Sequence, residues 1–505
     1  MSGARLVPLA PLLACALSST GCGPAVAPPV AGAPPHALRA EGGIPDAPFR
    51  GQAPAPEPRP RWVPPRPTAT TLANGMHLLV VERRSPAVVS AALIVRGGTA
   101  GYPQATTALA VASTIATQGT SHQDSPGLAD TLNGLFADMT TGTSPEDSLR
   151  YRVRCMSKSF DGALQVLHDV VVEPTLSQPL LDVERQHRLA MGQRDRDDPG
   201  LVGQRMLFEA IFGADHPYAL SHRPGTDRLS ALTVDEVTRA WRRAIDPSEA
   251  TLLVAGDVDA AALAGRVQTM FGGWKHDPAH AAPTTPPPPS PMAPRLFVID
   301  RPGAAQATIL YGAATPPATI SAPWPIEAVT RELFGGMPSS RLARTLRDDL
   351  GVAPWSATRS WSRRGPGVMF WQGGVERDEA PEVLAALARR VAELRERGPE
   401  DGELADAKQR VGRVLDREFE TAAGMIDSLT EIPVLGWSSD ELVLRAGRVE
   451  ALTAADVRTA VPPPESMKAV VIGDLGVLRD RLVALGWGEI EERTPEGERV
   501  RSFTR

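Results

Sequence analysis

A repeated helix-and-strand unit constrains the fold of this chain more than any other feature of its sequence. Residues 229–240 (LSALTVDEVTRA) are similar to residues 449–460 (VEALTAADVRTA), and each segment precedes a short apolar run, ending at Asp257 and Asp474 respectively. The helical segments begin 220 residues apart and the apolar runs end 217 residues apart. Self-similarity in both order and separation indicates two copies of one structural unit.

Each repeated helix carries its own start signal. Thr233 is followed three residues later by Glu236, and Thr453 by Asp456, which is the pattern of a capping box. The chain has 505 residues, of which 42% are hydrophobic, so it can bury more than one core. Strands at both ends of each copy and long helices between them predict an α+β fold of two homologous domains, each with a sheet and a helical layer.

The remaining boundaries follow from composition. A Pro-rich segment, 276–294, cannot form a central strand or helix and is predicted to link the first domain, 68–275, to the second, 295–490. Residues 491–505 are assigned to a polar tail. In the first domain, the Asn74-Gly75 turn in residues 71–82 predicts a hairpin, residues 88–95 a second strand, and residues 105–117 a buried helix.

The first 22 residues are typical of an export signal. Arg5 precedes an apolar stretch, residues 6–17, that is too short to span a bilayer, and the segment ends in Ser19-Thr20-Gly21-Cys22. This ending resembles a bacterial lipobox and predicts lipid attachment at Cys22; the alternative is a simple cleaved signal with an incidental cysteine. Residues 23–67 are rich in Pro and Ala and predict a disordered tether. The expected location is the bacterial cell envelope, on the periplasmic side, anchored by lipid to the outer membrane.

The charge and the cysteine content of the chain limit which binding partners and disulfides are expected. The net charge is −6 and the sequence has no long basic run, so no nucleic-acid partner is expected. Only three cysteines occur, one of them Cys15 in the signal, so Cys155 has no evident disulfide partner.

Several segments, in their order and spacing, carry a resemblance to a known family. They are ANGMHLLVVE at 73–82, HPY at 216–218, and FGGMPSSRLARTLRDDLG at 334–351. They resemble the insulinase or pitrilysin-like zinc peptidases, which include the mitochondrial processing peptidase, and the match extends from about residue 71 to residue 488. The resemblance implies the processing-peptidase fold and an inverted zinc motif, H-x-x-E-H, on a helix of the first domain.

The positions that would hold the metal have been replaced. The resemblance places the two His ligands at Ala110 and Thr114, the general base at Ser113 and a downstream Glu ligand at Met191. A catalytic zinc site needs three N, O or S ligands from the protein, and Ser cannot act as a carboxylate base. The nine histidines form no other metal-binding motif. The sequence therefore predicts no zinc, no other cofactor and no hydrolysis by the family mechanism.

Substrate contacts are predicted in the second domain. The family's Arg and Tyr, seven residues apart, would bind the substrate backbone; here Arg347 keeps the Arg position and Pro354 replaces the Tyr, with Trp355 beside it. Arg347 and Trp355 are therefore candidate substrate-binding residues. The alternative is that Arg347 is a solvated or ion-paired helix residue next to Asp348 and Asp349.

Three functions remain open at this point. The first is a catalytically inactive subunit that pairs with a zinc-bearing relative, forms a peptide-binding chamber with it and takes part in proteolysis. The second is a structural or scaffold subunit that handles no peptide. The third is an independent metallopeptidase, which the replaced ligands disfavour.

Overall fold

The computed structural model describes residues 63–142, 146–223, 225–318, 324–352 and 355–504. The predicted signal, Cys22, most of the tether and Pro354 lie outside these residues. Among the described helices, none is long and apolar enough to cross a bilayer.

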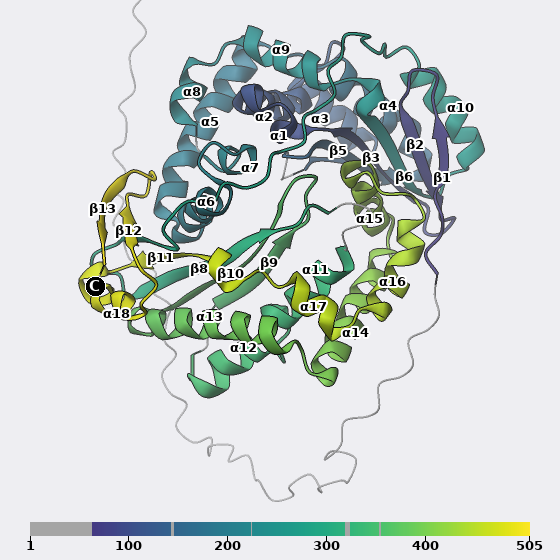
Figure 1. Cartoon of the computed structure of the whole chain (residues 1–505). Helices are drawn as coiled ribbons and strands as arrows, with labels where there is room; N and C mark the ends of the chain where they lie inside the picture. Colours follow the sequence, from purple (N-terminus) through teal and green to yellow (C-terminus); the bar gives the residue numbers. More distant parts are fainter. Residues whose placement is uncertain (1–62, 143–145, 224, 319–323, 353–354, 505) are drawn as a thin grey trace, which may run out of the picture. The chain divides into compact units, whose positions relative to one another are not determined.

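Two sheets with the same strand order form the framework of the chain (Figure 1). The first has the order β1-β2-β6-β3-β5-β4 and the second β13-β12-β7-β11-β8-β10-β9, so the five strands β2-β6-β3-β5-β4 correspond to β7-β11-β8-β10-β9. This correspondence agrees with the sequence repeat. The strands of the first sheet are β1 (Thr68–Thr71), β2 (His77–Glu82), β3 (Val88–Arg96), β4 (Asp138–Thr141), β5 (Ser148–Met156) and β6 (Ala250–Gly256). Those of the second sheet are β7 (Leu296–Asp300), β8 (Gln306–Thr315), β9 (Trp355–Trp361), β10 (Gly367–Glu376), β11 (Lys468–Gly473), β12 (Ile490–Arg493) and β13 (Arg499–Phe503).

Helices of each repeat cover one face of their own sheet, and the predicted α+β class is confirmed. The first repeat contributes α2 (Thr106–Ile115), α3 (Ser125–Gly134), α4 (Phe160–Val172), α5 (Gln178–Asp197), α8 (Thr226–Ala231), α9 (Val234–Ala244) and α10 (Ala260–Phe271). Its short helices α1 (Gly98–Gly101) and α7 (Pro217–Leu220) instead place Ala100 and Tyr218 in a core shared with the second sheet. The second contributes α11 (Trp324–Arg331), α12 (Arg341–Arg344), α13 (Ala380–Arg397), α14 (Asp401–Glu418), α16 (Glu441–Ala451), α17 (Ala454–Ala460) and α18 (Leu475–Ala484).

Local predictions made from sequence agree well with the structure. Thr233 and Glu236 form a capping box at the start of α9, and Thr453 and Asp456 form another at the start of α17. The hairpin joins β1 to β2, and the predicted buried helix is α2, extended at each end by a short 3-10 turn.

Two further helices are exchanged between the repeats. Helix α6 (Pro199–Phe212), from the first repeat, packs on β8 and β11 of the second sheet, where Phe208 contributes to a core with Phe370. Helix α15 (Ala422–Leu435), from the second repeat, packs on β3 and β6 of the first sheet. Every residue of β6 and of β11 is buried, so each sheet is apolar on both faces and needs a cover on both. The exchange supplies the second cover.

Close approach of α6 to its sheet depends on a glycine. A Cβ atom at Gly203 would lie 2.3 Å from Cδ1 of Leu310, so a larger residue would push the helix outward or force the leucine to move.

The linker follows the same helix, because the backbone nitrogens of Ser290 and Met292 donate to carbonyl groups of α6 at 2.9 Å. As predicted from its prolines, residues 276–294 contain no helix or strand.

The end of the chain differs from the sequence-based prediction. The sequence predicts a polar tail at residues 491–505, but β12 and β13 form an antiparallel pair at the edge of the second sheet, so the boundary at 490 falls inside β12. Ile490 and Phe503 anchor the pair in the core, while Glu492 pairs with Arg501 at 2.6 Å. Charged residues point to both faces of β12, and Glu491 and Glu492 are buried, so no alternation of apolar and polar residues predicts a strand here.

The exchanged helices should be essential to stability. We predict that Leu429→Ala in α15, where the side chain is fully buried, lowers the free energy of unfolding by about 2–5 kcal/mol. The matched control is Leu444→Ala in α16, whose side chain is 47% exposed and should cost far less. Denaturant titration followed by circular dichroism measures both; equal losses would contradict a central role for the exchange.

Candidate functional site

Helix α2 carries the three positions that the resemblance assigns to metal ligands and base. Ala110, Ser113 and Thr114 are all partly exposed. The Ser113 hydroxyl donates to the Ala110 carbonyl at 2.9 Å and the Thr114 hydroxyl to the same carbonyl at 3.3 Å. Both hydroxyls are therefore used within the helix, an arrangement that polar side chains commonly adopt there.

A guanidinium group from α5 occupies the space beside these residues. Arg188 Nη2 donates to the Ala110 carbonyl and to Thr114 Oγ1, at 2.9 Å in each case, and Nε donates to Glu184 Oε1 at 2.5 Å. The protein's own cation thus lies against the two positions that the resemblance assigns to the paired histidines. Met191, three residues further along α5, is 39% exposed.

These residues do not fit a zinc ion. Ala110 and Met191 offer no nitrogen or oxygen ligand, Thr114 offers one hydroxyl, and Arg188 would repel a metal cation. Within the part of the chain that the structure describes, no three His, Cys, Asp or Glu side chains come together as a metal site. Sequence reasoning missed Arg188, although its position one helical turn before Met191 could have indicated it.

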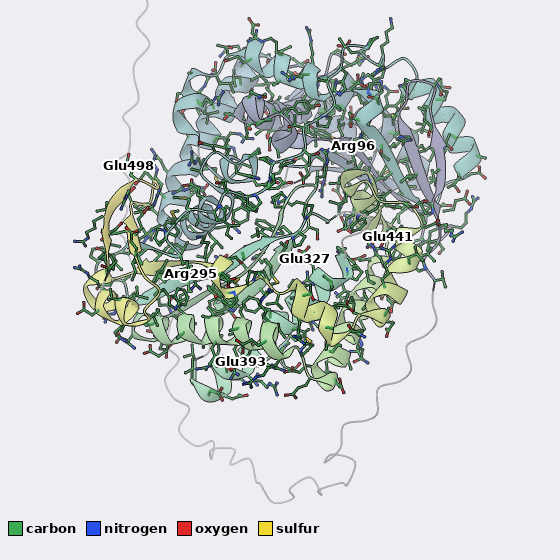
Figure 2. The ribbon with its side chains drawn as sticks, viewed as in Figure 1. Arg96, Arg295, Glu327, Glu393, Glu441 and Glu498 are labelled. Atoms are coloured by element: carbon green, nitrogen blue, oxygen red, sulfur yellow. The ribbon has the colours of Figure 1, made fainter. Side chains whose placement is uncertain are left out.

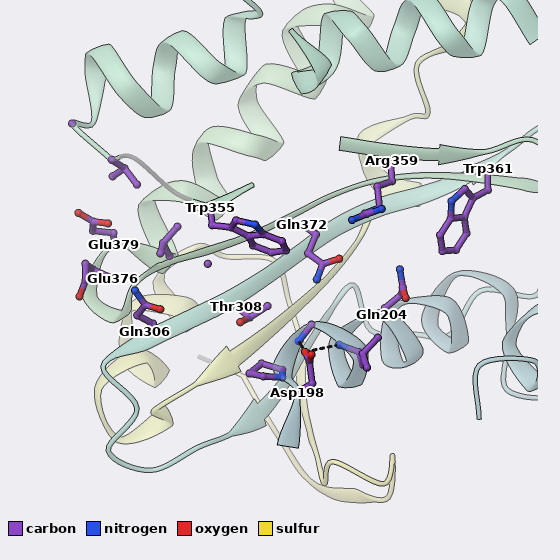
Figure 3. Close-up of a pocket in the computed structure, with 17 residues that line it drawn as sticks. Asp198, Gln204, Gln306, Thr308, Trp355, Arg359, Trp361, Gln372, Glu376 and Glu379 are labelled. Atoms are coloured by element: carbon purple, nitrogen blue, oxygen red, sulfur yellow. Dashed lines mark hydrogen bonds between the residues drawn. The ribbon is translucent and has the colours of Figure 1, made fainter. Parts of the chain in front are cut away.

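A cavity of about 790 Å³ lies between the start of α6 and the second sheet (Figure 3). Helix α6 is fixed there by Asp198, whose carboxylate accepts from the backbone nitrogens of Gly200 at 2.7 Å and Leu201 at 3.2 Å. The side chains of β9 and β10 form much of the opposite wall. The polar and aromatic residues around the cavity include Gln204, Gln306, Thr308, Trp355, Arg359, Trp361, Gln372, Glu376 and Glu379.

The two candidate substrate-binding residues occupy different surroundings. Trp355 opens the edge strand β9, is 64% exposed and lines the cavity. Arg347 does not line it; its Nε donates to Asp348 Oδ1 at 2.7 Å and its side chain is 57% exposed. The geometry of Arg347 is that of the ion-paired alternative. Substrate binding by either residue remains a prediction.

A buried charged cluster joins the repeats next to this cavity. Arg363, in the turn between β9 and β10, lies 3.3 Å from Glu146 Oε2, on the segment before β5. The Tyr218 hydroxyl donates to Asp147 Oδ1 at 2.8 Å and accepts from the Gly365 nitrogen at 3.0 Å. All of these charged residues are at most 5% exposed. The hairpin of the second repeat is therefore fixed to the first by desolvated ion pairs and hydrogen bonds.

Burial and pairing set the protonation of the cluster. Burial opposes the charge of Glu146, yet Arg363 and His222 together lower the pKa of its carboxyl. Burial raises the pKa of Asp147 despite the nearby Arg363 guanidinium. Burial also raises the pKa of Glu327 of α11 (Figure 2), which accepts from the Ser362 hydroxyl at 2.8 Å.

The HPY segment supports the same junction. His216 caps α7, since its Nδ1 accepts from the Tyr218 nitrogen at 3.2 Å, and its Nε2 lies 3.0 Å from the carbonyl of Pro287 in the linker. These two contacts give His216 a structural role at the junction.

Comparison with known proteins agrees with the geometry. Residues 231–411 match the family described as the Peptidase M16 inactive domain. The predicted resemblance to the insulinase-like, or M16, peptidase family is confirmed. An uncharacterized zinc protease of Streptomyces coelicolor is 24% identical over 71% of this chain and 76% of its own length. The Bacillus subtilis protein YmfF, named a probable inactive metalloprotease, is 21% identical over 62% of this chain and 78% of its own length.

Solved structures share the fold of this chain. A peptidase M16 inactive domain from Pseudomonas fluorescens has a TM-score of 0.72 at 18% identity and covers 81% of this chain and 98% of its own. The periplasmic protease PqqL of Escherichia coli has a TM-score of 0.67 at 14% identity and covers 82% of this chain and 46% of its own. The family match and the name of the Bacillus relative support a catalytically inactive member.

The ion pairs at the repeat junction should be strongly coupled. We predict that Arg363→Met destabilises the fold by roughly 3–5 kcal/mol, because it leaves Glu146 buried without its cation. Adding Glu146→Gln should recover part of that loss. A double-mutant cycle in denaturant measures the coupling, and strictly additive effects would contradict it.

Arg188 should compete with metal at the replaced ligand positions. We predict that a variant with Ala110→His, Ser113→Glu, Thr114→His and Met191→Glu retains more zinc when Arg188→Ala is added, because the guanidinium lies against two of those positions. Elemental analysis after dialysis gives the zinc content. The unaltered chain is the control, and a full equivalent of zinc bound to it would overturn the predicted loss of the site.

Proposed function

We propose that this chain is a non-catalytic M16 subunit that binds peptides in the cavity beside Trp355 and pairs with a zinc-bearing relative in proteolysis. The observation that carries the proposal is an open cavity beside a sheet edge that no other described strand covers, in a fold where Ala, Ser, Thr and Met stand at the expected metal-site positions. A scaffold subunit would have no need for such a cavity.

The cavity has the size and lining of a ligand site. Its volume of about 790 Å³ falls in the usual range for such sites, roughly 300–1,000 Å³. Strand β9 pairs only with β10 among the described residues, so its outer edge offers backbone donors and acceptors to an extended peptide. Trp355 adds an exposed aromatic surface at the start of that strand.

The replaced site is the reason to expect a partner. Arg188 and the residues around it provide no metal-bound water, so cleavage of a bound peptide would need a catalytic centre on another chain. A relative that keeps H-x-x-E-H would supply it. The proposed location is the periplasm, with Cys22 carrying the lipid anchor; one structural neighbour is described as a periplasmic protease.

Peptide binding should depend on Trp355. We predict that Trp355→Ala weakens the affinity for a mixture of extended peptides by about tenfold, which is roughly 1.4 kcal/mol and within the range of an interface anchor. The matched control is Leu350→Ala, a 37% exposed side chain that does not line the cavity and should leave the affinity unchanged. Fluorescence anisotropy with labelled peptides gives both affinities.

This chain should alter the peptidase activity of a zinc-bearing relative. Light scattering of the mixture detects the complex, and peptide cleavage measured with and without this chain detects its effect. A complex without peptide binding by this chain would favour the scaffold function. Peptide cleavage by this chain alone, abolished by a chelator, would favour the independent peptidase.

A further inference from the structure

A second cavity, of about 310 Å³, lies beside the replaced metal-ligand positions. Arg188 and Met191 of α5 form part of its wall. Leu201 and Gln204 of α6 line both this cavity and the larger one, so the two adjoin along that helix. A ligand in the larger cavity can therefore extend a side group into the smaller one.

Arg205 is the unusual residue of this second cavity. Arg205 is only 7% exposed. Among the described residues, its side chain has no hydrogen-bond or ion-pair partner. A guanidinium stays protonated in proteins and carries five N–H donors. No Arg205 nitrogen is both shielded from solvent and unpaired, so its free donors face the cavity, where water or an anionic group of a ligand can accept from them.

The other arginines around the cavity are already engaged. Arg188 pairs with Glu184, and Arg223 donates to Glu209 Oε1 at 2.7 Å. Glu209 also attracts Arg205, but without a hydrogen bond between them. Asp195 is the acidic residue of the lining and is partly exposed. Arg205 is thus the cation among the described lining residues that lacks a direct partner.

We infer that this second cavity binds a carboxylate group carried by a peptide whose main chain lies in the larger cavity. The inference rests on the proposed peptide-binding function and gives its substrate class: peptides with an acidic side chain or a free C-terminus at this point. The guanidinium of Arg205 matches a carboxylate with two parallel N–H donors, and the Gln204 amide lies on the path between the cavities.

The size of the cavity is compatible with this ligand. A water molecule has a share of about 30 Å³ in the liquid, so about 310 Å³ accommodates a carboxylate, its methylene groups and several waters. An arginine-lined cavity also discriminates by charge, since a neutral amide would leave the buried cation without a charged acceptor.

The test compares peptides that differ only in one charge. Short acetylated peptides carry either a single Glu or a Gln at each position in turn, with the C-terminus amidated; a second set without acidic side chains has a free or an amidated C-terminus. We expect one set to show about tenfold tighter binding of the charged form, by anisotropy competition. Preference in the first set identifies a side chain as the source, and preference in the second identifies the terminus.

Two variants test whether Arg205 causes the preference for charged peptides. Arg205→Met keeps a side chain of similar length and removes the charge, so it should abolish the discrimination while neutral peptides still bind. Arg413→Met, on the exposed surface of α14 and in neither cavity, is the matched control and should keep it. Equal binding of charged and neutral peptides to the unaltered chain would overturn the carboxylate site and leave peptide binding intact. Absence of any peptide binding would overturn the proposed function and this inference together.

Discussion

The exchange of α6 and α15 between the repeats is the contact on which the remainder of this structure depends. Each sheet has strands whose residues are buried throughout, and a half-molecule could cover only one face with its own helices. The other face receives its apolar cover from the opposite repeat. Burial of apolar surface is the main stabilising term in folding, so neither repeat has a complete core without the other.

The same exchange places the functional features. Helix α6 begins at the larger cavity, where Asp198 fixes its first turn, and it carries Gln204 and Arg205 at the boundary with the smaller one. Because α6 packs on the second sheet, residues of the first repeat face the edge strand of the second. The Arg363 cluster then holds the β9–β10 turn against the first repeat. Both cavities are therefore consequences of how the repeats share helices.

Sequence reasoning succeeded where the signal is local. The capping residues Thr233 and Thr453 act on their own helices, so their pattern predicted both helix starts and the repeat. Apolar periodicity shows that a helix is buried but not which sheet buries it, so the exchange could not be predicted. The resemblance identifies only positions that have a role in the family, and Arg188 is not one of them. The structure alone shows that the Arg188 side chain reaches Thr114. The strands near the C-terminus were missed because paired Arg and Glu residues, among them the buried Glu491 and Glu492, take the place of an alternating apolar pattern.

The hydrogen bonds of Arg188 have one further consequence. Helices α2 and α5 are joined by a positive charge that belongs to the polypeptide, rather than by an ion taken from solution. That contact forms in the same cooperative step as the helices and has no separate loading equilibrium. The contact between α2 and α5 therefore does not depend on the supply of metal, and a chelator cannot weaken it.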